Sequence, residues 1–392
     1  MELFAPVNVV SSSIEILQLP STTSSTELLM IHSLENEIST GFQANAPPIA
    51  VDDCTGGVYY LRTKSRRIVA VFKPSDEEPY APNNPKRYLH PAQQKSKHEP
   101  ESSSPHPEYK YKSQLDLNTE LQSGIRVGIA AGDAAVRDVA AYLLDKNRHA
   151  GVPLTVLATA SHPAFHYSAN LASFTKRHPK IGALQTYIPH KCTADDISSS
   201  LFSVEDVHAI ALLDIRLANQ DRHGGNILVV EQAKRVYKLV PIDHGACLPR
   251  VSEMEETSFL WLSWPQTKRP FSSDTLAYIA SLDPFEECRV LQQTLPRAHQ
   301  LESQAMLTLL ACTVFLQVCA LEKNMSAFEI GMLMCRHGTF CQQQPQPSAL
   351  ELLLTKTLDD VAVQMGDKEL CFKAVVLSFR RHLSALLSTE KL

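Results

Sequence analysis

An acid and an amide stand in a loop between two apolar segments, in LANQDRHGGNILVV (residues 217–230). Asp221 and Asn226 have the D-x-x-x-x-N spacing that suits phosphoryl transfer. A carboxylate at the first position can receive the proton of an attacking hydroxyl, and an amide oxygen at the second can hold a Mg²⁺ ion that bridges phosphates. We therefore expect a catalytic loop, with Asn226 as a metal ligand and with three candidate catalytic residues, Asp221, Arg222 and His223.

A second carboxylate and an ammonium group would complete the set that this chemistry needs. Asp243 follows the apolar strand 239–242 in YKLVPIDHG and is a candidate Mg²⁺ ligand. Lys73 ends the alternating strand RRIVAVFK, where it could hold the α- and β-phosphates of ATP. A lysine at a strand end often only extends to solvent. The order of the four residues along the chain is much harder to obtain by chance.

An acid on the helix expected from Asp133 to Asn147 should pair with Lys73. Asp133 shares the apolar stripe of that helix with Val136 and Ala140, so we expect it to face the ATP site and Asp138 to point elsewhere. Because Asp133 follows a glycine, a simple helix cap is an equally plausible role for it. Which of the two acids pairs with Lys73 stays open.

The segments that must position these residues form a strand-rich first half and a helix-rich second half. Periodicity predicts a β-hairpin from Gly56 to Lys73, strands over 152–159 and 181–188, and a buried helix from Val204 to Ala218. Further helices are expected over 26–41, 298–322 and 348–364. We therefore predict an α+β fold of two lobes, a small β-rich lobe with one helix and a larger helical lobe, with a ligand cleft near 187–192.

The chain divides into a flexible tail over 1–24, an N-lobe over 25–188 with a polar insertion at about 90–118, and a C-lobe over 189–392. A net charge of −5 without a basic block argues against a nucleic-acid partner. Nine unclustered cysteines indicate reduced thiols in a cytoplasmic protein. The longest apolar run, Ala305 to Leu321, is short for a transmembrane span and predicts a buried helix. Any membrane contact should be peripheral.

The order DRH in place of HRD, and DHG in place of DFG, separates the chain from ordinary protein kinases. It resembles the phosphatidylinositol 3- and 4-kinase catalytic domain family, in particular the type II-like, plant gamma-type phosphatidylinositol 4-kinases. The resemblance covers roughly residues 30 to 355. The matching segments are TGGVYYLR (55–62), VAVFKPSDEEPYAPNNPK (69–86), RDVAAYLLD (137–145), LLDIRLANQDRHGGNILV (212–229), LVPIDHGACLP (239–249), WLSWPQTKRPFS (261–272) and EIGMLMCR (329–336).

The resemblance implies transfer of the ATP γ-phosphate to the inositol 4-hydroxyl of phosphatidylinositol in a membrane surface. By motif position, Lys73 resembles the ATP lysine, Asp221 the catalytic aspartate, and Asn226 and Asp243 the Mg²⁺ ligands. The hinge that receives adenine through backbone groups would be 185–189, with Gln185, Tyr187 and Ile188. Gly56 and Gly57 would form the loop over the phosphates, with Thr55 adding a hydroxyl. Family members tend to carry glutamate at positions 133 and 138, so an aspartate there shortens the reach to Lys73.

The segment that should shape the acceptor site, 244–274, contains three cations: Arg250, Lys268 and Arg269. A polyphosphorylated headgroup would favour a denser cluster, so this composition favours unphosphorylated phosphatidylinositol. Lys268 and Arg269 could equally belong to a solvated loop. Trp261 and Trp264 lie in the same segment, where core packing is favoured over insertion into a membrane interface. A protein Ser/Thr kinase, or a nucleotide-binding scaffold of low activity, would use the same residues.

Overall fold

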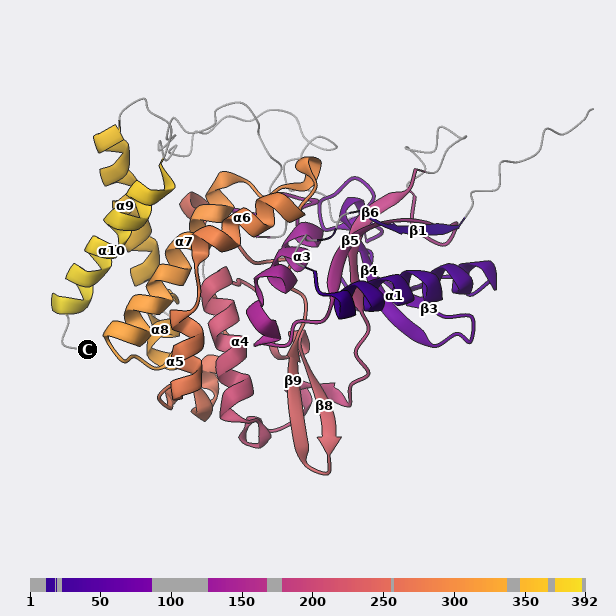
Figure 1. The fold of residues 1–392 in the computed structure, drawn as a ribbon, viewed down its shortest axis with the longest axis horizontal. Coiled ribbons are helices and arrows are strands. Elements are labelled where there is room, and N and C mark those ends of the chain that lie inside the picture. The colour runs from indigo at the N-terminus through magenta and orange to yellow at the C-terminus, as the bar shows by residue number, and fades with distance from the viewer. Residues whose placement is uncertain are drawn as a thin grey trace, which may run out of the picture.

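The computed structural model describes residues 12–17, 19, 23–86, 126–167, 178–254, 257–336, 346–365 and 371–389. A sheet with two helices forms one end of the molecule, and a helical body with a β-hairpin forms the other (Figure 1). This arrangement confirms the predicted two-lobed α+β fold. The polar insertion expected at about 90–118 lies outside the described residues.

The N-lobe contains an antiparallel sheet of six strands in the order β1-β5-β6-β4-β3-β2. Its central strands are rich in small and β-branched residues and are buried on both faces. The expectation of a tail over 1–24 is corrected in part, because residues 13–16 form an edge strand that pairs with β5. The strands are β1 Ser13–Ile16, β2 Ile49–Ala50, β3 Tyr59–Arg62, β4 Ile68–Pro74, β5 Thr155–Ser161 and β6 Lys180–Thr186.

Two helices, α1 (Ser25–Gln43) and α3 (Ala134–Leu144), cover this sheet. A capping box starts α1: the Ser24 side chain accepts from the Glu27 N–H, and the Glu27 carboxylate accepts from the Ser24 N–H. The end of α3 meets the start of α1, since the Tyr142 hydroxyl donates to Glu27 at 2.9 Å. Nearly every residue of α3 is buried, because β5, β6 and α6 all pack against it.

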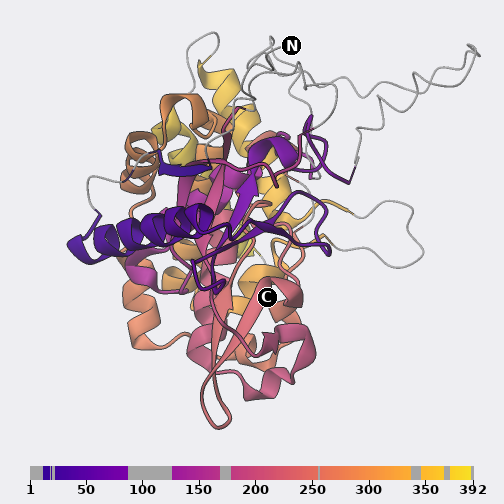
Figure 2. The same cartoon turned by 90° about the vertical axis from the view of Figure 1, so that its right-hand side faces the viewer.

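The C-lobe is organised around α4 (Val204–Leu217), which is buried from Asp206 to its end. Beside it, β7 (Cys192–Thr193), β8 (Ile227–Ala233) and β9 (Val236–Pro241) form a small antiparallel sheet whose β8–β9 hairpin projects from the body (Figures 1 and 2). The remaining helices are α5 Ser273–Ala280, α6 Pro284–Thr294, α7 Ser303–Gln317, α8 Ala327–Met332, α9 Ala349–Met365 and α10 Phe372–Thr389. The last two form a pair at the far end of the lobe (Figure 1).

Helix α7 continues through a π-helical turn, Val318–Glu322, and is the core helix of the C-lobe. Within the described ranges, Ser303–Glu322 is the one helix long and apolar enough to cross a membrane, with a mean hydropathy of 1.9. However, 83% of its apolar window is buried against α4, α6, α10 and neighbouring segments. The expectation of a buried helix over Ala305 to Leu321 is therefore confirmed.

Candidate active site

The ammonium group of Lys73 lies between two carboxylates at the junction of the lobes. Its Nζ atom is 2.9 Å from Oδ2 of Asp138 on α3 and 3.0 Å from Oδ1 of Asp243, which follows β9. Lys73 and Asp138 are largely buried, with 19% and 2% of their side chains exposed, whereas Asp243 is 50% exposed. Burial alone would lower the pKa of Lys73, but the two carboxylates outweigh it and raise that pKa. The same attraction to Lys73 lowers the pKa of Asp243.

The partner of Lys73 on α3 is Asp138, so the expectation that Asp133 faces the ATP site was wrong. Asp133 precedes the first residue of α3 and its carboxylate lies 3.7 Å from Nη2 of Arg137. It also makes no side-chain capping bond. The apolar stripe gave the wrong prediction because α3 is buried on almost all sides. Burial of a residue on this helix therefore does not show that its side chain points into the site. Asp138 additionally accepts the His244 N–H, which ties α3 to the segment after Asp243.

A buried aspartate on α4 organises the catalytic loop. Asp214 accepts from Nε of Arg222 at 2.9 Å, from the Asn219 side chain at 2.9 Å and from the Trp261 indole at 3.0 Å. The Arg222 side chain is fully buried in this pair. It therefore cannot reach a substrate, and the expectation of a catalytic role for Arg222 is corrected to a positioning role.

Arg222 also fixes Asn226 against the residue before Asp243. Its Nη1 donates to the backbone oxygens of Asn226 (2.7 Å) and Ile242 (3.0 Å), and the Ile242 N–H donates to the Asn226 oxygen at 3.0 Å. Asp243 itself has a left-handed backbone (φ 55°), a conformation that asparagine and aspartate tolerate best among residues with a Cβ. The two expected metal ligands thus stand next to each other.

The donor set at this position fits a hard divalent cation. The side-chain hydrogen bonds of the described residues use Nδ2 of Asn226 and Oδ1 of Asp243, which leaves Oδ1 of Asn226 and Oδ2 of Asp243 to coordinate. One carboxylate and one amide oxygen, together with phosphate oxygens, are typical Mg²⁺ ligands. No group of three or more His, Cys, Asp or Glu within the described ranges could hold a metal alone. Such a cation would therefore depend on nucleotide oxygens.

The exposed end of the catalytic loop carries Asp221 and His223. The Asp221 N–H donates to the Asn219 side chain at 3.0 Å, and its carboxylate accepts from Arg126 at 2.7 Å. His223 is exposed. A Cβ on Gly224 would lie 2.1 Å from Oδ1 of Asp195, so this glycine allows a close contact within the C-lobe, not the approach to phosphates that such a loop glycine suggests.

The expected phosphate loop is supported from behind by residues 75–86, the SDEEPYAPNNPK segment. The Gly57 N–H donates to the Glu77 backbone oxygen at 2.9 Å, and a Cβ on Gly57 would lie 2.0 Å from the Glu77 carboxylate. The Asn84 side chain donates to the backbone oxygens of Thr55 and Glu77. Gly56 has more room, since its nearest neighbour would be 3.2 Å away. Thr55 is exposed at the tip of the loop.

The same segment also holds α3. The buried Glu78 carboxylate accepts the backbone N–H groups of Gly132, Ala134 and Ala135 at 2.8 to 3.0 Å, so it caps the helix that carries Asp138. Burial raises the pKa of Glu78 to about 8. Two elements of the site, the loop and α3, are therefore positioned by one stretch of twelve residues, 75–86.

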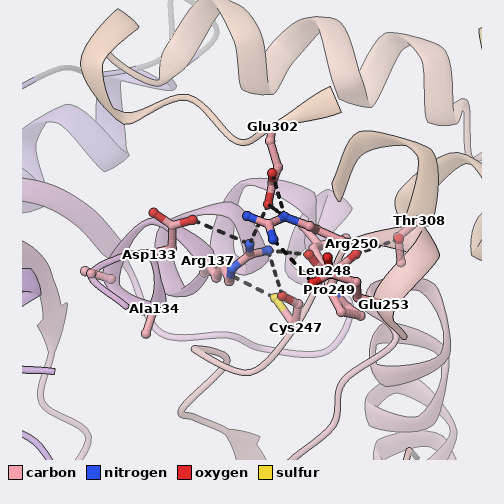
Figure 3. A network of polar contacts seen from close by, with 12 residues as sticks. Asp133, Ala134, Arg137, Cys247, Leu248, Pro249, Arg250, Glu253, Glu302 and Thr308 are labelled. Carbon is pink, nitrogen blue, oxygen red and sulfur yellow. Dashed lines mark hydrogen bonds and ion pairs between the residues drawn. The ribbon is translucent and has the colours of Figure 1, made fainter. Parts of the chain in front are cut away.

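A second attachment joins α3 to the C-lobe (Figure 3). The buried Arg137 side chain donates to the backbone oxygens of Cys247 and Leu248, just beyond Asp243, and its Nη2 lies 3.9 Å from Glu302. Glu302 in turn accepts both Nε contacts of Arg250, at 2.8 and 2.9 Å. The first turn of α3 is therefore held by residues 75–86 on one side and by the C-lobe on the other, which fixes Asp138, one residue after Arg137, relative to Lys73.

The expected hinge, 185–189, connects β6 of the N-lobe with β7 of the C-lobe. The Gln185 side chain is buried and donates to Thr155, so only its backbone could face a ligand. The Tyr187 N–H is already used by the Val69 oxygen at 2.9 Å. In the described part of the chain, no hydrogen bond uses the Tyr187 oxygen or the Ile188 N–H.

The cations expected at the acceptor site are separated by the structure. Arg250 is held by Glu302 and Glu253 and faces α7 (Figure 3). Lys268 is exposed and lies 4.8 Å above the Phe328 ring, and Arg269 is exposed beside it. Trp261 and Trp264 are both buried, which confirms core packing for the two tryptophans.

Three residues that shape the site escaped sequence reasoning. Asp214 could have been found, since an acid inside an apolar helix must be paired if the helix is buried. Glu78 belongs to a segment recognised only for its resemblance, and the distant helix end that it caps is not visible in the sequence. Arg126 follows directly on residues outside the described ranges and has no motif around it.

Comparisons with known proteins identify the family. Residues 55–323 match the family described as phosphatidylinositol 3- and 4-kinase. The chain is 36% identical over 338 residues to phosphatidylinositol 4-kinase gamma 6 of Arabidopsis thaliana, covering 83% of this chain and 49% of the relative. It is 34% identical over 356 residues to the gamma 5 protein of the same plant, covering 89% and 50%. The chain thus spans about half the length of these curated relatives.

Proposed function

Because the chain belongs to the phosphatidylinositol 3- and 4-kinase family, we propose that it transfers the γ-phosphate of ATP to the 4-hydroxyl of phosphatidylinositol. The products would be phosphatidylinositol 4-phosphate and ADP. The observation that carries the proposal is the convergence of Lys73, Asp138 and Asp243, with Asn226 held next to Asp243. The printed names of the similar plant proteins support the choice of the 4-hydroxyl.

ATP would bind between the lobes. The Tyr187 oxygen and the Ile188 N–H would receive adenine, the loop of Thr55, Gly56 and Gly57 would cover the phosphates, and Lys73 would hold the α- and β-phosphates. Asp138 orients Lys73 and thus has the role that was expected for Asp133. A prepositioned ammonium lowers the barrier because it need not reorganise during the reaction.

Asn226 and Asp243 would hold Mg²⁺ through the two oxygens that the hydrogen bonds leave available. The bound ion would neutralise charge on the phosphates. Asp221 would accept the proton of the inositol hydroxyl, since its carboxylate is the exposed acid of the catalytic loop. His223 is exposed beside it and would line the acceptor side of the cleft.

The distribution of cations supports phosphatidylinositol over its polyphosphorylated forms. Of the three cations in 244–274, Arg250 is engaged by Glu302, whereas Lys268 and Arg269 follow Gln266, which contacts His208 near the start of α4, at the other end of that helix from the catalytic loop. These three cations do not form the dense cluster that a polyphosphorylated headgroup would favour. We propose that the substrate is taken from the cytoplasmic face of a membrane by peripheral contact.

A product assay tests the function. The purified protein is incubated with labelled ATP, Mg²⁺ and vesicles of phosphatidylinositol in phosphatidylcholine, and the lipid product is identified by thin-layer chromatography. We expect phosphatidylinositol 4-phosphate from the wild type and none from Asp221→Asn, which should still bind ATP. A parallel reaction contains casein as a generic acceptor. Label in casein with none in lipid would contradict the proposal and support the protein-kinase alternative.

A further inference from the structure

An arginine of the N-lobe contacts the acid of the catalytic loop. Arg126 donates from Nη2 to Oδ1 of Asp221 at 2.7 Å, and the two side chains are 40% and 39% exposed. Among the described residues, Asp221 is the only polar partner of this guanidinium. A guanidinium has five N–H donors, and the contact with Asp221 uses one of its nitrogen atoms, Nη2.

The backbone that carries Arg126 is fixed at two points. The Gly128 oxygen accepts the Arg250 N–H at 2.8 Å, and the Gly132 N–H donates to Glu78 at 2.8 Å. Gly128 has a φ of +77°, and a Cβ there would lie 3.0 Å from the Glu253 backbone oxygen, so this tight packing requires glycine. Arg250 is itself anchored by Glu302 (Figure 3). Arg126 is therefore presented to the catalytic loop by packing, not only by an exposed ion pair.

The reaction develops charge close to this position. In the transfer, the γ-phosphorus forms a bond to the acceptor oxygen while its bond to the β,γ-bridging oxygen breaks. The hydroxyl proton passes to Asp221, and ADP leaves with the electron pair of the broken bond. Because the attacking oxygen must contact both Asp221 and the γ-phosphorus, the equatorial phosphoryl oxygens come within reach of a guanidinium bound to Asp221.

We propose that Arg126 is a further catalytic residue, which donates to the oxygens of the transferred phosphoryl group when the acceptor hydroxyl replaces it on Asp221. The other cations of the site are committed elsewhere: Lys73 to Asp138 and Asp243, and Arg222 to Asp214. This inference rests on the proposed function in one respect, that ATP is the phosphate donor. It does not depend on which molecule is the acceptor. A planar fork suits this task better than an ammonium.

Turnover is measured for Arg126→Ala, Arg126→Lys and a matched control, Arg235→Ala, which removes an exposed arginine from the β8–β9 turn. Each variant is assayed with phosphatidylinositol vesicles and, without lipid, for ATP hydrolysis. We expect Arg126→Ala to lower kcat by about 100-fold or more in both reactions, with the KM for ATP within about 3-fold of the wild type. Arg126→Lys should recover part of the loss, and Arg235→Ala should match the wild type.

Binding of ADP with Mg²⁺ and aluminium fluoride, a mimic of the transferred group, gives a readout that needs no acceptor. Arg126→Ala should lose the tighter binding of this mimic over ADP alone while it keeps its affinity for ATP. Unchanged or increased turnover in Arg126→Ala, or a change confined to the KM for lipid, would overturn the proposal. So would a wild type that binds the mimic no better than ADP. A wild type that binds the mimic but makes no lipid product would refute the lipid substrate alone.

Discussion

Lys73 pairs with Asp138 at 2.9 Å, five residues beyond the acid that opens the helix. Asp138→Asn should therefore lower kcat/KM for ATP by about 30-fold or more, because Lys73 loses the carboxylate that orients it toward the phosphates. Asp133→Asn, at the residue that precedes the same helix, is the matched control, and we expect less than about a 3-fold change. Steady-state kinetics with varied ATP measure both. Equal losses in the two variants would mean that the contact at Asp138 is not specific.

The phosphate loop offers a second matched pair. Gly57→Ala should raise the KM for ATP by about 10-fold or more, since its Cβ would meet Glu77 at 2.0 Å and displace the loop. Gly56→Ala, whose nearest contact would be 3.2 Å, should change that KM by less than about 3-fold. Steady-state kinetics with varied ATP measure the KM of both variants, and the melting temperature of each variant shows whether its fold is intact. A larger effect at Gly56 would contradict the support described for residues 75–86.

Asp214 should be essential for stability. Asp214→Asn leaves the buried Arg222 without its counter-charge, and breaking such a pair costs about 3–5 kcal/mol of unfolding free energy. Urea denaturation followed by circular dichroism measures this loss. Glu286→Gln, which removes an exposed acid paired with Arg289 three residues on, should leave the urea midpoint unchanged. A midpoint for Asp214→Asn close to the wild type would show that the pair does not support the loop.

Glu27 should make stability depend on pH in the acidic range. Burial opposes its ionisation, but hydrogen bonds from Arg148, Ser24 and Tyr142 lower its pKa from 4.5 to about 2. Because the folded-state pKa is depressed, the stabilisation is present above pH 4.5 and is lost as the pH falls toward 2. Glu27→Gln should thus cost about 1 kcal/mol at pH 7, after allowance for solvent screening.

The pH dependence separates this effect from a simple loss of charge. In urea titrations at pH 7, 5 and 4, the gap between wild type and Glu27→Gln should narrow only below pH 4.5. Glu35→Gln removes another acid from α1 and serves as the control for net charge. A gap that stays constant down to pH 4 would contradict the role given to Glu27.

The sequence predicted what is local and periodic, and failed where distant segments meet. The hairpin that ends in Lys73, the buried helix before Asp221 and the strand before Asp243 follow from alternation and apolar runs, and the structure contains all three. The choice between Asp133 and Asp138 could not follow from periodicity, because α3 is buried on nearly all sides. Glu78 and the start of α3, which it contacts, are more than fifty residues apart in the sequence, so no local pattern predicts this contact.

Helices α5, α6, α8 and α10 were also missed, and length or composition explains this for α8 and α6. Helix α8 has only six residues, and α6 carries charged residues through a mainly polar sequence. The structure shows their starts instead at side-chain caps such as Ser272, Asp283 and Ser326, each of which accepts backbone N–H groups of the first turn. Serine and aspartate at these positions could have predicted the starts of these helices from the sequence.

The attachment of the phosphate loop and of α3 to a single stretch, residues 75–86, has a pharmacological consequence. A compound that inserted behind this stretch and prised it from the sheet would release both elements at once. Because the displaced loop would bind ATP less well, ATP and such a compound would weaken each other's binding, although the compound would lie outside the adenine pocket. A change in the adenine pocket alone would therefore not remove the contacts of the compound.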